Sequence, residues 1–419
     1  MAAVTLIQPE TPQQLCDAVA EAVAERVPME IVGHGTKRGF GHPVQAAHTL
    51  VLNRLSGVTL YEPDELVLTA AAGTPLAEIE ALLAANGQHL AFEPADLAPL
   101  LGGEGLLGGG PTIGGVVACN LAGPRRIQSG AARDHVLGFT AVSGRAEVFK
   151  SGGRVVKNVT GYDLSKLMTG SFGTLAVLAE VTVKVLPRPE KTRTVLIFGL
   201  DCAAAVDALT RALATPHEVS GAAFLPAPIA ARAPVGRVAG GGRSVTALRV
   251  EGPGPSVLFR ASALAADIGP GVEVDELHSH NSAALWRWLA DVGPFAADPF
   301  SADRQSVVWR LSIPPSLVPA LLRGLAVDDA RYFLDWAGGL VWLALPPEAE
   351  LDGGAARVRR VLAGLGAGYA TLVRAPDALR GAVPVFQPQE PALAALTRRI
   401  KDSFDPAGVL NPGRLYPGT

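Results

Sequence analysis

The sequence TIGGVVACNLAGPRRIQSGAARDHVLGFTAVSG occupies residues 112–144, and KNVTGYDLSKLMTGSFGTLAVLAEVTVKV occupies residues 157–185. In both segments, glycines and other small residues recur between apolar, strand-like runs. Glycine permits tight bends and lets another group approach the backbone closely. The stretch therefore predicts a cradle for a large ligand rather than a flexible linker. Its glycines include Gly114, Gly115, Gly123, Gly130, Gly161, Gly170 and Gly173.

Length and composition predict a globular protein of two or three packed units. The chain has 419 residues, of which 48% are hydrophobic and 18% are charged, and this is enough for more than one core. The formal net charge of −3 leaves no basic surplus for a polyanion. We therefore expect no binding to nucleic acid and no attraction to an anionic membrane surface.

The cysteines and the N-terminal sequence indicate whether the protein binds a metal and in which cellular compartment it lies. Cys16, Cys119 and Cys202 lie far apart with no CxxC pair, which argues against an iron–sulfur cluster, a structural zinc site or a disulfide scaffold. The N-terminus lacks a signal-peptide pattern, and no window reaches about 18 uninterrupted apolar residues. We expect a cytoplasmic protein with no metal of its own, which does not insert into the membrane and reaches the inner membrane only through its complex.

Apolar periodicity predicts alternating helices and strands before residue 187. A helix begins at Thr11-Pro12, and strands cover residues 29–32 and 66–71. Residues 177–185 alternate in a way that predicts a strand with one face on solvent. The predicted fold class therefore contains both helices and strands.

Prolines and charges at residues 187–193 predict a domain boundary. Beyond it, strand-like and helix-like segments alternate, which predicts an antiparallel sheet covered by helices. Residues 231–243 are rich in glycine and arginine and predict an exposed loop. A last helix covers residues 391–404, and the apolar residues of the tail after it predict that the C-terminus docks on the body.

Three blocks carry the candidate chemistry. The first, GHGTK at residues 33–37, follows a strand and could offer backbone N–H groups, the Thr36 hydroxyl and the Lys37 ammonium to a pyrophosphate. It is neither a Walker loop nor a Rossmann fingerprint, so alone it is more typical of a plain turn. The second block is TIGG at residues 112–115 with the polar residues after it, and the third joins residues 157–164 to GSFGT at residues 170–174.

Together and in this order, the three blocks resemble the FAD-binding domain of the vanillyl-alcohol oxidase/p-cresol methylhydroxylase family. A closer resemblance, to the FAD-binding subunits of bacterial glycolate oxidases, covers nearly the whole chain. It includes GTPLAEIEALLAANGQHLAFEPAD at residues 73–96 and FDPAGVLNPGRLYPG at residues 404–418. Glycine-rich loops at residues 102–110 and 240–242 depart from the pattern.

The resemblance implies an α+β fold. A two-part FAD-binding domain of the p-cresol methylhydroxylase type would span residues 1–187. A smaller ferredoxin-like α+β domain, the cap, would span residues 194–385. Residues 390–419 would form a helix and tail that return to the FAD-binding domain.

The resemblance also implies that the chain binds FAD, held non-covalently. Residues 33–37 would hold the pyrophosphate, residues 112–115 would line the flavin, and residues 170–174 would contact the adenosine half. The residues expected to bind FAD are Gly33, His34, Gly35, Thr36, Lys37, Pro94, Thr112, Ile113, Gly114, Gly115, Asn120, Gly123, Arg126, Gly130, Arg133, Asp134, Gly161, Tyr162, Asp163, Gly170, Gly173, Thr174 and Val181.

Histidines leave two alternatives open. His34 or His135 could carry a covalent flavin bond, as a histidine does in some members of the superfamily, although a histidine in a glycine turn is more often a packing residue. His278 and His280 could share a strand face as metal ligands, but no acidic or histidine partners lie near them in sequence. We therefore favour a solvated loop for this pair.

A substrate-binding constellation is missing from the sequence. Oxidation of a 2-hydroxy acid needs a cation for the carboxylate and a base for the hydroxyl proton. Catalytic relatives carry HxGDGNxH and EHG motifs near the C-terminus, and this chain has neither. No catalytic residue is therefore assigned.

These observations favour the FAD-binding subunit of a complex that oxidises glycolate or a similar small 2-hydroxy acid. Its flavin would take part in electron transfer with a catalytic FAD subunit and an iron–sulfur subunit. One alternative is an autonomous FAD-dependent 2-hydroxy-acid dehydrogenase, with Arg310 or Arg414 beside the flavin. Another is a non-catalytic assembly subunit that keeps only the fold.

Overall fold

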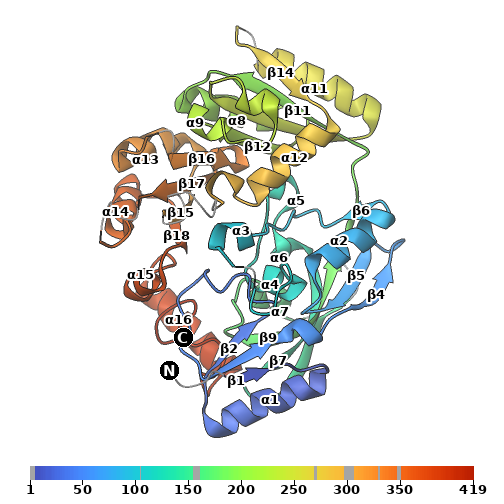
Figure 1. Ribbon diagram of the computed structural model, residues 1–419, viewed down its shortest axis with the longest axis vertical. Helices are drawn as coiled ribbons and strands as arrows, with labels where there is room; N and C mark the ends of the chain where they lie inside the picture. The colour runs from blue at the N-terminus through green and yellow to red at the C-terminus, as the bar shows by residue number, and fades with distance from the viewer. Residues whose placement is uncertain are drawn as a thin grey trace. The chain divides into compact units, whose positions relative to one another are not determined.

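The computed structural model of the protein divides into two compact units (Figure 1). Unit 1 comprises Met1–Leu121, Ala131–Arg188 and Pro384–Thr419, and unit 2 comprises Ala122–Gly130 and Pro189–Val383. Residues 157–160 of the third predicted block lie outside the described part of the chain. The structure describes residues 5–103, 105–153, 161–268, 271–296, 306–328, 331–346 and 351–419.

A three-stranded parallel sheet of order β1-β3-β2 begins unit 1. Helix α1 (Pro12–Glu25) starts where the sequence predicts it, because Thr11 Oγ1 accepts a hydrogen bond of 3.2 Å from Gln14 N and proline occupies the first turn. The strand predicted at residues 29–32 is confirmed as β2 (Met29–Val32). The other elements are β1 (Thr5–Ile7), β3 (His48–Val51) and η1 (Leu52–Arg54).

The larger sheet of unit 1 has five antiparallel strands in the order β4-β5-β9-β7-β8. The strand predicted at residues 177–185 lies at its centre, and its Val181 and Val183 are fully buried. The prediction that its other face meets solvent is wrong at Thr182. This side chain is buried, and its hydroxyl lies 2.9 Å from that of buried Thr69 on the neighbouring strand. The strands are β4 (Val58–Glu62), β5 (Val67–Ala71), β7 (Val136–Ser143), β8 (Val148–Gly152) and β9 (Ala176–Lys184).

Short elements connect the two sheets of unit 1. Helix α2 (Leu76–Ala85) follows Pro75 and ends just before Asn86. Strands β6 (Gln88–His89) and β10 (Leu186–Pro187) form a small antiparallel pair. The remaining helices are α3 (Ala98–Leu101), α4 (Ile113–Ala118), α6 (Ala132–His135) and α7 (Leu164–Met168).

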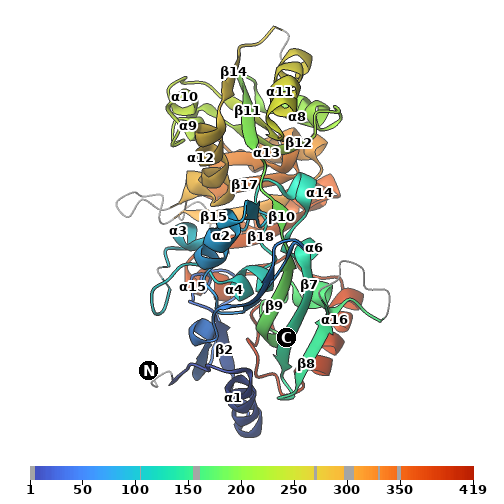
Figure 2. The same ribbon diagram turned by 90° about the vertical axis from the view of Figure 1, so that its right-hand side faces the viewer.

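The C-terminal segment packs within unit 1, which confirms the predicted docking of the tail. Helix α16 (Pro391–Phe404) lies beside β8 (Figure 2), where the Phe404 and Phe149 rings are 6.0 Å apart. The tail then runs along β2: Met29 N donates to Val409 O at 2.8 Å, and Asn411 N donates to Met29 O at 3.0 Å. Val409 and Leu410 are almost fully buried.

Unit 2 contains one antiparallel sheet of eight strands, in the order β14-β11-β13-β12-β16-β17-β15-β18. Each half follows a β-α-β-β-α-β order, so the predicted ferredoxin-like pattern occurs twice. The halves join edge to edge where β12 pairs with β16. The strands are β11 (Lys191–Phe198), β12 (Val219–Leu225), β13 (Val245–Gly252), β14 (Val274–Leu277), β15 (Val307–Ser312), β16 (Tyr332–Asp335), β17 (Leu340–Leu345) and β18 (Tyr369–Arg374).

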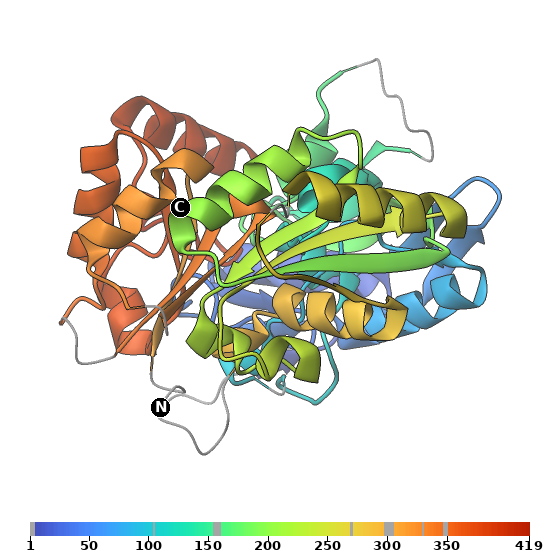
Figure 3. The same ribbon diagram turned by 90° about the horizontal axis from the view of Figure 1, so that it is seen from above.

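Helices cover the sheet of unit 2. In the first half, α8 (Cys202–Leu213) and α11 (Gly254–Ile268) lie on one face and α12 (Ser279–Ala290) on the other (Figure 3). Among the residues the structure describes, no helix combines the length and apolarity needed to cross a bilayer. The other helices of unit 2 are α5 (Arg126–Ser129), α9 (Ala227–Ala230), α10 (Gly236–Ala239), η2 (Gly293–Phe295), η4 (Pro315–Leu317), α13 (Val318–Leu325), η6 (Trp336–Gly338), α14 (Ala355–Leu365) and α15 (Asp377–Ala382).

Two local predictions for unit 2 need correction. Residues 231–243 are not simply an exposed loop, because they contain α10 and bury Val235 and Val238. His278 immediately precedes α12 and His280 lies in its first turn, so they do not share a strand face. Both histidines are exposed.

Candidate functional site

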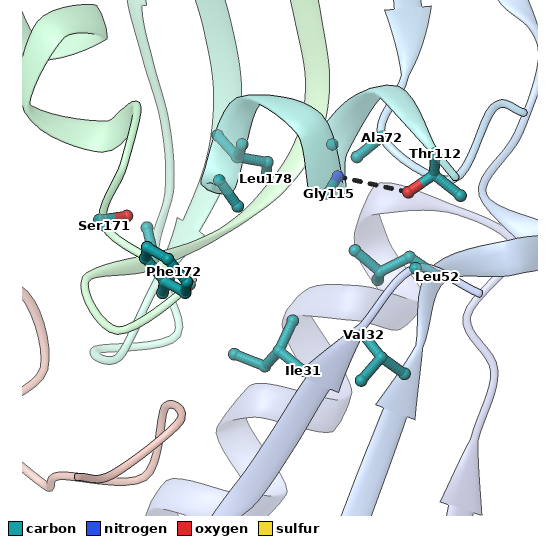
Figure 4. Close-up of a pocket in the computed structure, with 14 residues that line it drawn as sticks. Ile31, Val32, Leu52, Ala72, Thr112, Gly115, Ser171, Phe172 and Leu178 are labelled. Carbon is teal, nitrogen blue, oxygen red and sulfur yellow. Dashed lines mark hydrogen bonds between the residues drawn. The ribbon is translucent and has the colours of Figure 1, made fainter. Parts of the chain in front are cut away.

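Two adjoining cavities lie in unit 1, where the first two predicted blocks and the GSFGT part of the third meet. The two cavities hold about 450 and 470 Å³ of empty space, part of which is open to solvent. Both are lined by the end of β2, by α4 and by Phe172. Figure 4 shows Gly115 of α4 and Thr112 just before this helix on one side, Ile31 and Val32 below them, and Phe172 opposite.

The loop at residues 33–37 brings a buried cation to one of these cavities. All five of its residues line the cavity. Burial lowers the pKa of the Lys37 ammonium below its ordinary value of 10.5, although Cys119 and Asp96 raise it. In the described part of the chain, Lys37 Nζ makes one hydrogen bond, a long one of 3.4 Å to Thr36 Oγ1. A desolvated ammonium with so weak a partner favours an anionic ligand.

Two further polar groups line the same cavity. Burial raises the pKa of the Cys119 thiol above its ordinary value, although the charges of Lys37 and Arg414 lower it. Arg414 donates to Lys37 O at 3.0 Å and to His42 O at 3.3 Å. Its guanidinium therefore supports the backbone of the loop that carries Lys37.

Close packing of glycines shapes the wall formed by α4. Thr112 caps this helix, with Oγ1 accepting from Gly115 N at 3.3 Å. A Cβ atom on Gly33 would collide with that same Thr112 hydroxyl. A Cβ atom on Gly114 would lie 2.7 Å from the Ala72 methyl group. Side chains at these positions would fill the space that the cavity needs.

The turn at residues 170–174 is fixed by the C-terminal tail. Phe172 has a left-handed backbone, with φ of 55°. Asn411 Nδ2 donates to Phe172 O at 2.8 Å, while Asn411 Oδ1 accepts from Ile31 N at 2.8 Å. One amide side chain thus connects the turn to β2. The Phe172 ring also packs edge-on against Phe40, with centroids 5.1 Å apart.

The unusual glycine-rich loop at residues 102–110 packs against the loop that carries Lys37. Leu106 N donates to His34 O at 2.8 Å, and His34 Nδ1 lies 2.8 Å from Gly110 O. Gly109 lies so close that a Cβ atom there would be 2.6 Å from His34 Nδ1. This loop therefore supports residues 33–37, and its extra glycines permit the close approach.

Some of the residues predicted to bind FAD meet at these cavities. Ile113 and Thr174 are buried next to lining residues, and Gly170 N donates to Val117 O in α4 at 3.1 Å. The predicted residues that line a cavity are Gly33, His34, Gly35, Thr36, Lys37, Thr112, Gly114, Gly115 and Gly173.

Other predicted residues lie away from the two cavities. Gly123, Arg126 and Gly130 belong to unit 2. Val181 is a core residue of β9, and Tyr162 is 92% exposed. The remaining ones have local structural roles or line neither cavity: Pro94, Asn120, Arg133, Asp134, Gly161 and Asp163.

Sequence reasoning missed several lining residues. Ile31, Val32 and Leu178 are ordinary strand residues, and only the sheet pairing brings them to the cavity. Asn411 lies in the tail, whose docking was predicted without assigning this residue to the ligand cradle. Arg414 lines the same cavity and was predicted beside the flavin only under the autonomous-dehydrogenase alternative. The sequence signal that could have identified Asn411 and Arg414 is their polar side chains next to the apolar residues of the tail.

His34 and His135 occupy different surroundings. His34 lines the cavity and is held by the glycine-rich loop. His135 is 1% exposed, and its ring packs against Phe92 with centroids 5.2 Å apart. The second histidine is thus a core residue, whereas the first stays on the cavity wall.

The chemistry of the lining fits FAD. A buried ammonium and a glycine-rich loop suit a pyrophosphate. The apolar walls formed by Val32, Leu52 and Leu178 suit an aromatic ring system. The close approach of Gly33 and Gly114 to their neighbours keeps this space open.

Replacing Gly33 with alanine tests this close packing. The new methyl group would collide with Thr112, so we expect a loss of about 1–3 kcal/mol in the free energy of unfolding and weaker FAD binding. Urea denaturation and FAD titration measure the two effects. The control is Gly364→Ala at an exposed position of α14, where nothing lies within 4 Å of the added methyl group and the helix should become slightly more stable. Equal stability of Gly33→Ala and the unaltered protein would contradict the close contact.

Comparison with known proteins identifies the family. Residues 3–152 match the family described as FAD binding domain. The glycolate oxidase subunit GlcE of Escherichia coli strain K12 is 34% identical over 96% of this chain and 97% of its own length. The glycolate oxidase subunit GlcD of Bacillus subtilis strain 168 is 29% identical over 48% of this chain and 41% of its own length.

A solved structure confirms the predicted fold. That of p-cresol methylhydroxylase with substrate bound aligns with a TM-score of 0.66 at 14% identity, over 98% of this chain and 88% of that one. The FAD-binding family match and the nearly full-length similarity to GlcE confirm the cofactor and the family predicted from the three blocks. The chain belongs to the family of FAD-dependent oxidoreductase subunits that includes the E. coli glycolate oxidase subunit GlcE.

Proposed function

We propose that the chain is the FAD-carrying subunit of a complex that oxidises glycolate or a related small 2-hydroxy acid. A second FAD subunit would hold the substrate site, and an iron–sulfur subunit would accept electrons. The nearly full-length similarity to GlcE supports the glycolate assignment, and the partial similarity to GlcD supports a second flavin subunit of related fold.

The observation that carries the proposal is the buried Lys37 ammonium in a cavity lined by three glycine-containing segments. Lys37 and the loop at residues 33–36 would hold the pyrophosphate. Thr112, Gly114 and Gly115 would lie against the flavin, and residues 171–173 would contact the adenosine half. FAD, when bound, supplies a two-electron acceptor. The chain's own residues would orient it, with Lys37 beside its pyrophosphate.

The test compares the isolated chain with the complex reconstituted from this chain, the second flavin subunit and the iron–sulfur subunit. We expect the isolated chain to show flavin absorbance that is released on denaturation, and to keep that absorbance when glycolate is added. The complex should reduce an artificial electron acceptor with glycolate. Rapid loss of flavin absorbance in the isolated chain would favour an autonomous dehydrogenase instead.

A matched variant separates an electron-transfer role from assembly alone. Thr112→Val removes the hydroxyl that caps α4 at the cavity wall while keeping a side chain of similar size. If the variant assembles without FAD and the complex keeps full activity, the chain serves only assembly and the proposal fails. Loss of activity in step with loss of FAD is the result we expect.

A further inference from the structure

Unit 2 contains a strained turn that presents a buried tryptophan. Trp336 and Ala337 both have left-handed backbones, with φ of 52° and 55°, and the turn is buried. Residues other than glycine rarely adopt this conformation, and such strain is retained mainly where the surroundings impose it. Trp336 Nε1 donates to Gly123 O at 3.1 Å, and Trp336 N donates to Asp335 Oδ1 at 2.7 Å. The indole ring is thus held in one orientation.

Two arginines from separate elements converge on this ring. Arg126, on α5, has its guanidinium carbon 4.3 Å from the centroid of the Trp336 ring. Arg310, on β15, has its guanidinium carbon 5.1 Å from the same centroid. On β15, Trp309 faces α14, where Arg359 covers its ring. Because side chains alternate along a strand, Arg310 lies on the opposite face of the sheet.

The charges of these two arginines have no close ionic partner, although Arg126 is exposed to solvent and only Arg310 is partly buried. Among the described residues, neither guanidinium has a hydrogen bond or an ion pair besides its contact with the ring. Burial and the charge of Arg126 lower the pKa of Arg310 to about 10, although Asp335 raises it. Arg310 therefore stays charged at neutral pH. Asp335 is the carboxylate that acts on it, which leaves the three side chains with one net positive charge.

The buried arginines Arg125, Arg249 and Arg374 of unit 2 have close partners. Arg125, next to Arg126 in sequence, forms an ion pair of 2.8 Å with Glu251, and both side chains are buried. Arg249 lies 3.4 Å from the same carboxylate. Arg374 donates to Ser306 O at 3.0 Å and to Phe295 O at 2.8 Å. The lack of a partner at Arg310 is therefore not a general property of this unit.

We propose that Arg126 and Arg310 bind a small monocarboxylate beside Trp336. One net positive charge is neutralised by one carboxylate, whereas a phosphate dianion would leave an excess negative charge. Planar guanidinium groups match the planar carboxylate and can each donate two hydrogen bonds to it. The indole face would cover the apolar part of the ligand. This inference goes beyond the proposed function, which places the substrate on the partner subunit.

The test is a calorimetric titration of the full FAD-loaded chain with four probes. Glycolate and acetate should bind in a saturable way. Glycolamide, which has the size of glycolate without the charge, should not bind. Inorganic phosphate should bind more weakly than glycolate, and tighter binding of phosphate would overturn the assignment to carboxylates. Absence of glycolate binding to the unaltered chain would overturn the proposal itself.

Substitutions of Arg126 and Arg310 test whether these two residues bind the carboxylate. Arg310→Met and Arg126→Met should each weaken glycolate binding by at least about tenfold, the usual effect of losing a charged hydrogen-bonding partner. The matched control is Arg359→Met, because Arg359 also lies over a tryptophan ring in unit 2, 5.3 Å from the centroid of Trp309, but outside this cluster. It should bind glycolate like the unaltered chain. Unchanged binding by Arg310→Met would overturn the proposal.

Folding of the variants is checked independently. Without ligand, Arg310→Met should melt at the same temperature as the unaltered chain or higher, because it removes a desolvated charge without an ion pair. Arg310→Lys keeps the charge without the planar fork, and its binding should be intermediate. FAD absorbance is recorded for every variant. A chain that keeps FAD but never binds glycolate would contradict this inference and leave the proposed function intact.

Discussion

Replacing Lys37 with methionine should weaken FAD binding by about 10- to 100-fold, the effect expected from losing a charged hydrogen-bond donor to an anion. Methionine has a similar length and keeps the apolar contacts of the side chain. The ammonium is buried in the cavity and has only a long hydrogen bond to Thr36. Its attraction to a pyrophosphate is therefore little weakened by competing partners or by water. Titration of the apoprotein with FAD, followed by flavin fluorescence, measures the loss.

The Lys37→Met change should weaken FAD binding without destabilising the apoprotein. Lys37 is desolvated, so folding without FAD carries a cost that methionine removes. We expect the free energy of unfolding of the apo variant to equal that of the unaltered apoprotein or to exceed it by about 1 kcal/mol. The control is Lys150→Met on exposed β8, which should change neither quantity. Equal weakening of FAD binding by both variants would show that the effect is not specific to the cavity.

The pKa of Lys37 also predicts how FAD binding depends on pH. Burial lowers this pKa in the apoprotein, and a bound pyrophosphate would raise it again. FAD affinity should therefore be greatest below the apoprotein pKa of Lys37. It should fall as the pH rises through the FAD-bound pKa, because the neutral amine does not attract an anion. The Lys37→Met variant should not show this decline in FAD affinity. The comparison distinguishes the titration of Lys37 from that of other groups.

Much of unit 1 could be predicted from the sequence because its signals are local. Thr11 caps α1 through its own hydroxyl, and the apolar run at residues 29–32 needs no distant information to form β2. The burial of Thr182 could not be predicted in this way. It depends on Thr69, which lies far away in sequence but pairs with it across the sheet.

The parts of the candidate site that require glycine could be predicted from the sequence. Gly33 and Gly114 mark positions where no side chain fits, and they remain recognisable without the structure. Asn411 was missed because it acts through two hydrogen bonds to residues from different parts of the chain. Arg126 was predicted at the cofactor, but residues 122–130 pack in unit 2, which no local pattern indicates.

Removal of the Asp405 carboxylate should cause a large loss of stability. Lys401 Nζ and Asp405 Oδ2 lie 2.6 Å apart, with side chains 6% and 0% exposed. Lys401 Nζ also donates to Thr174 O at 2.7 Å and to Leu410 O at 2.9 Å. Asp405→Ala leaves this ammonium buried without a counter-charge. We expect the free energy of unfolding to fall by about 3–5 kcal/mol, measured by urea denaturation.

A double-mutant cycle tests whether the ion pair itself is responsible. Lys401→Met combined with Asp405→Ala should cost clearly less than the sum of the single changes, because no unpaired charge remains. The exposed pair Arg54–Glu10 is the control, and Glu10→Ala should cost less than about 1 kcal/mol. If the losses in the free energy of unfolding caused by Lys401→Met and Asp405→Ala were additive, the two side chains would not be energetically coupled.

Loss of the same ion pair should also weaken FAD binding, although neither residue lines a cavity. Asp405 accepts hydrogen bonds from Val409 N at 3.1 Å and from Leu410 N at 2.8 Å, immediately before Asn411. Asn411 in turn connects β2 to the turn of Phe172 at the cavity wall. Asp405→Asn, which keeps one of the two acceptor oxygens but not the charge, should therefore retain more FAD affinity than Asp405→Ala. An Asp405→Ala chain that remains folded in buffer and binds FAD with unchanged affinity would show that the tail stabilises unit 1 without shaping the cofactor site.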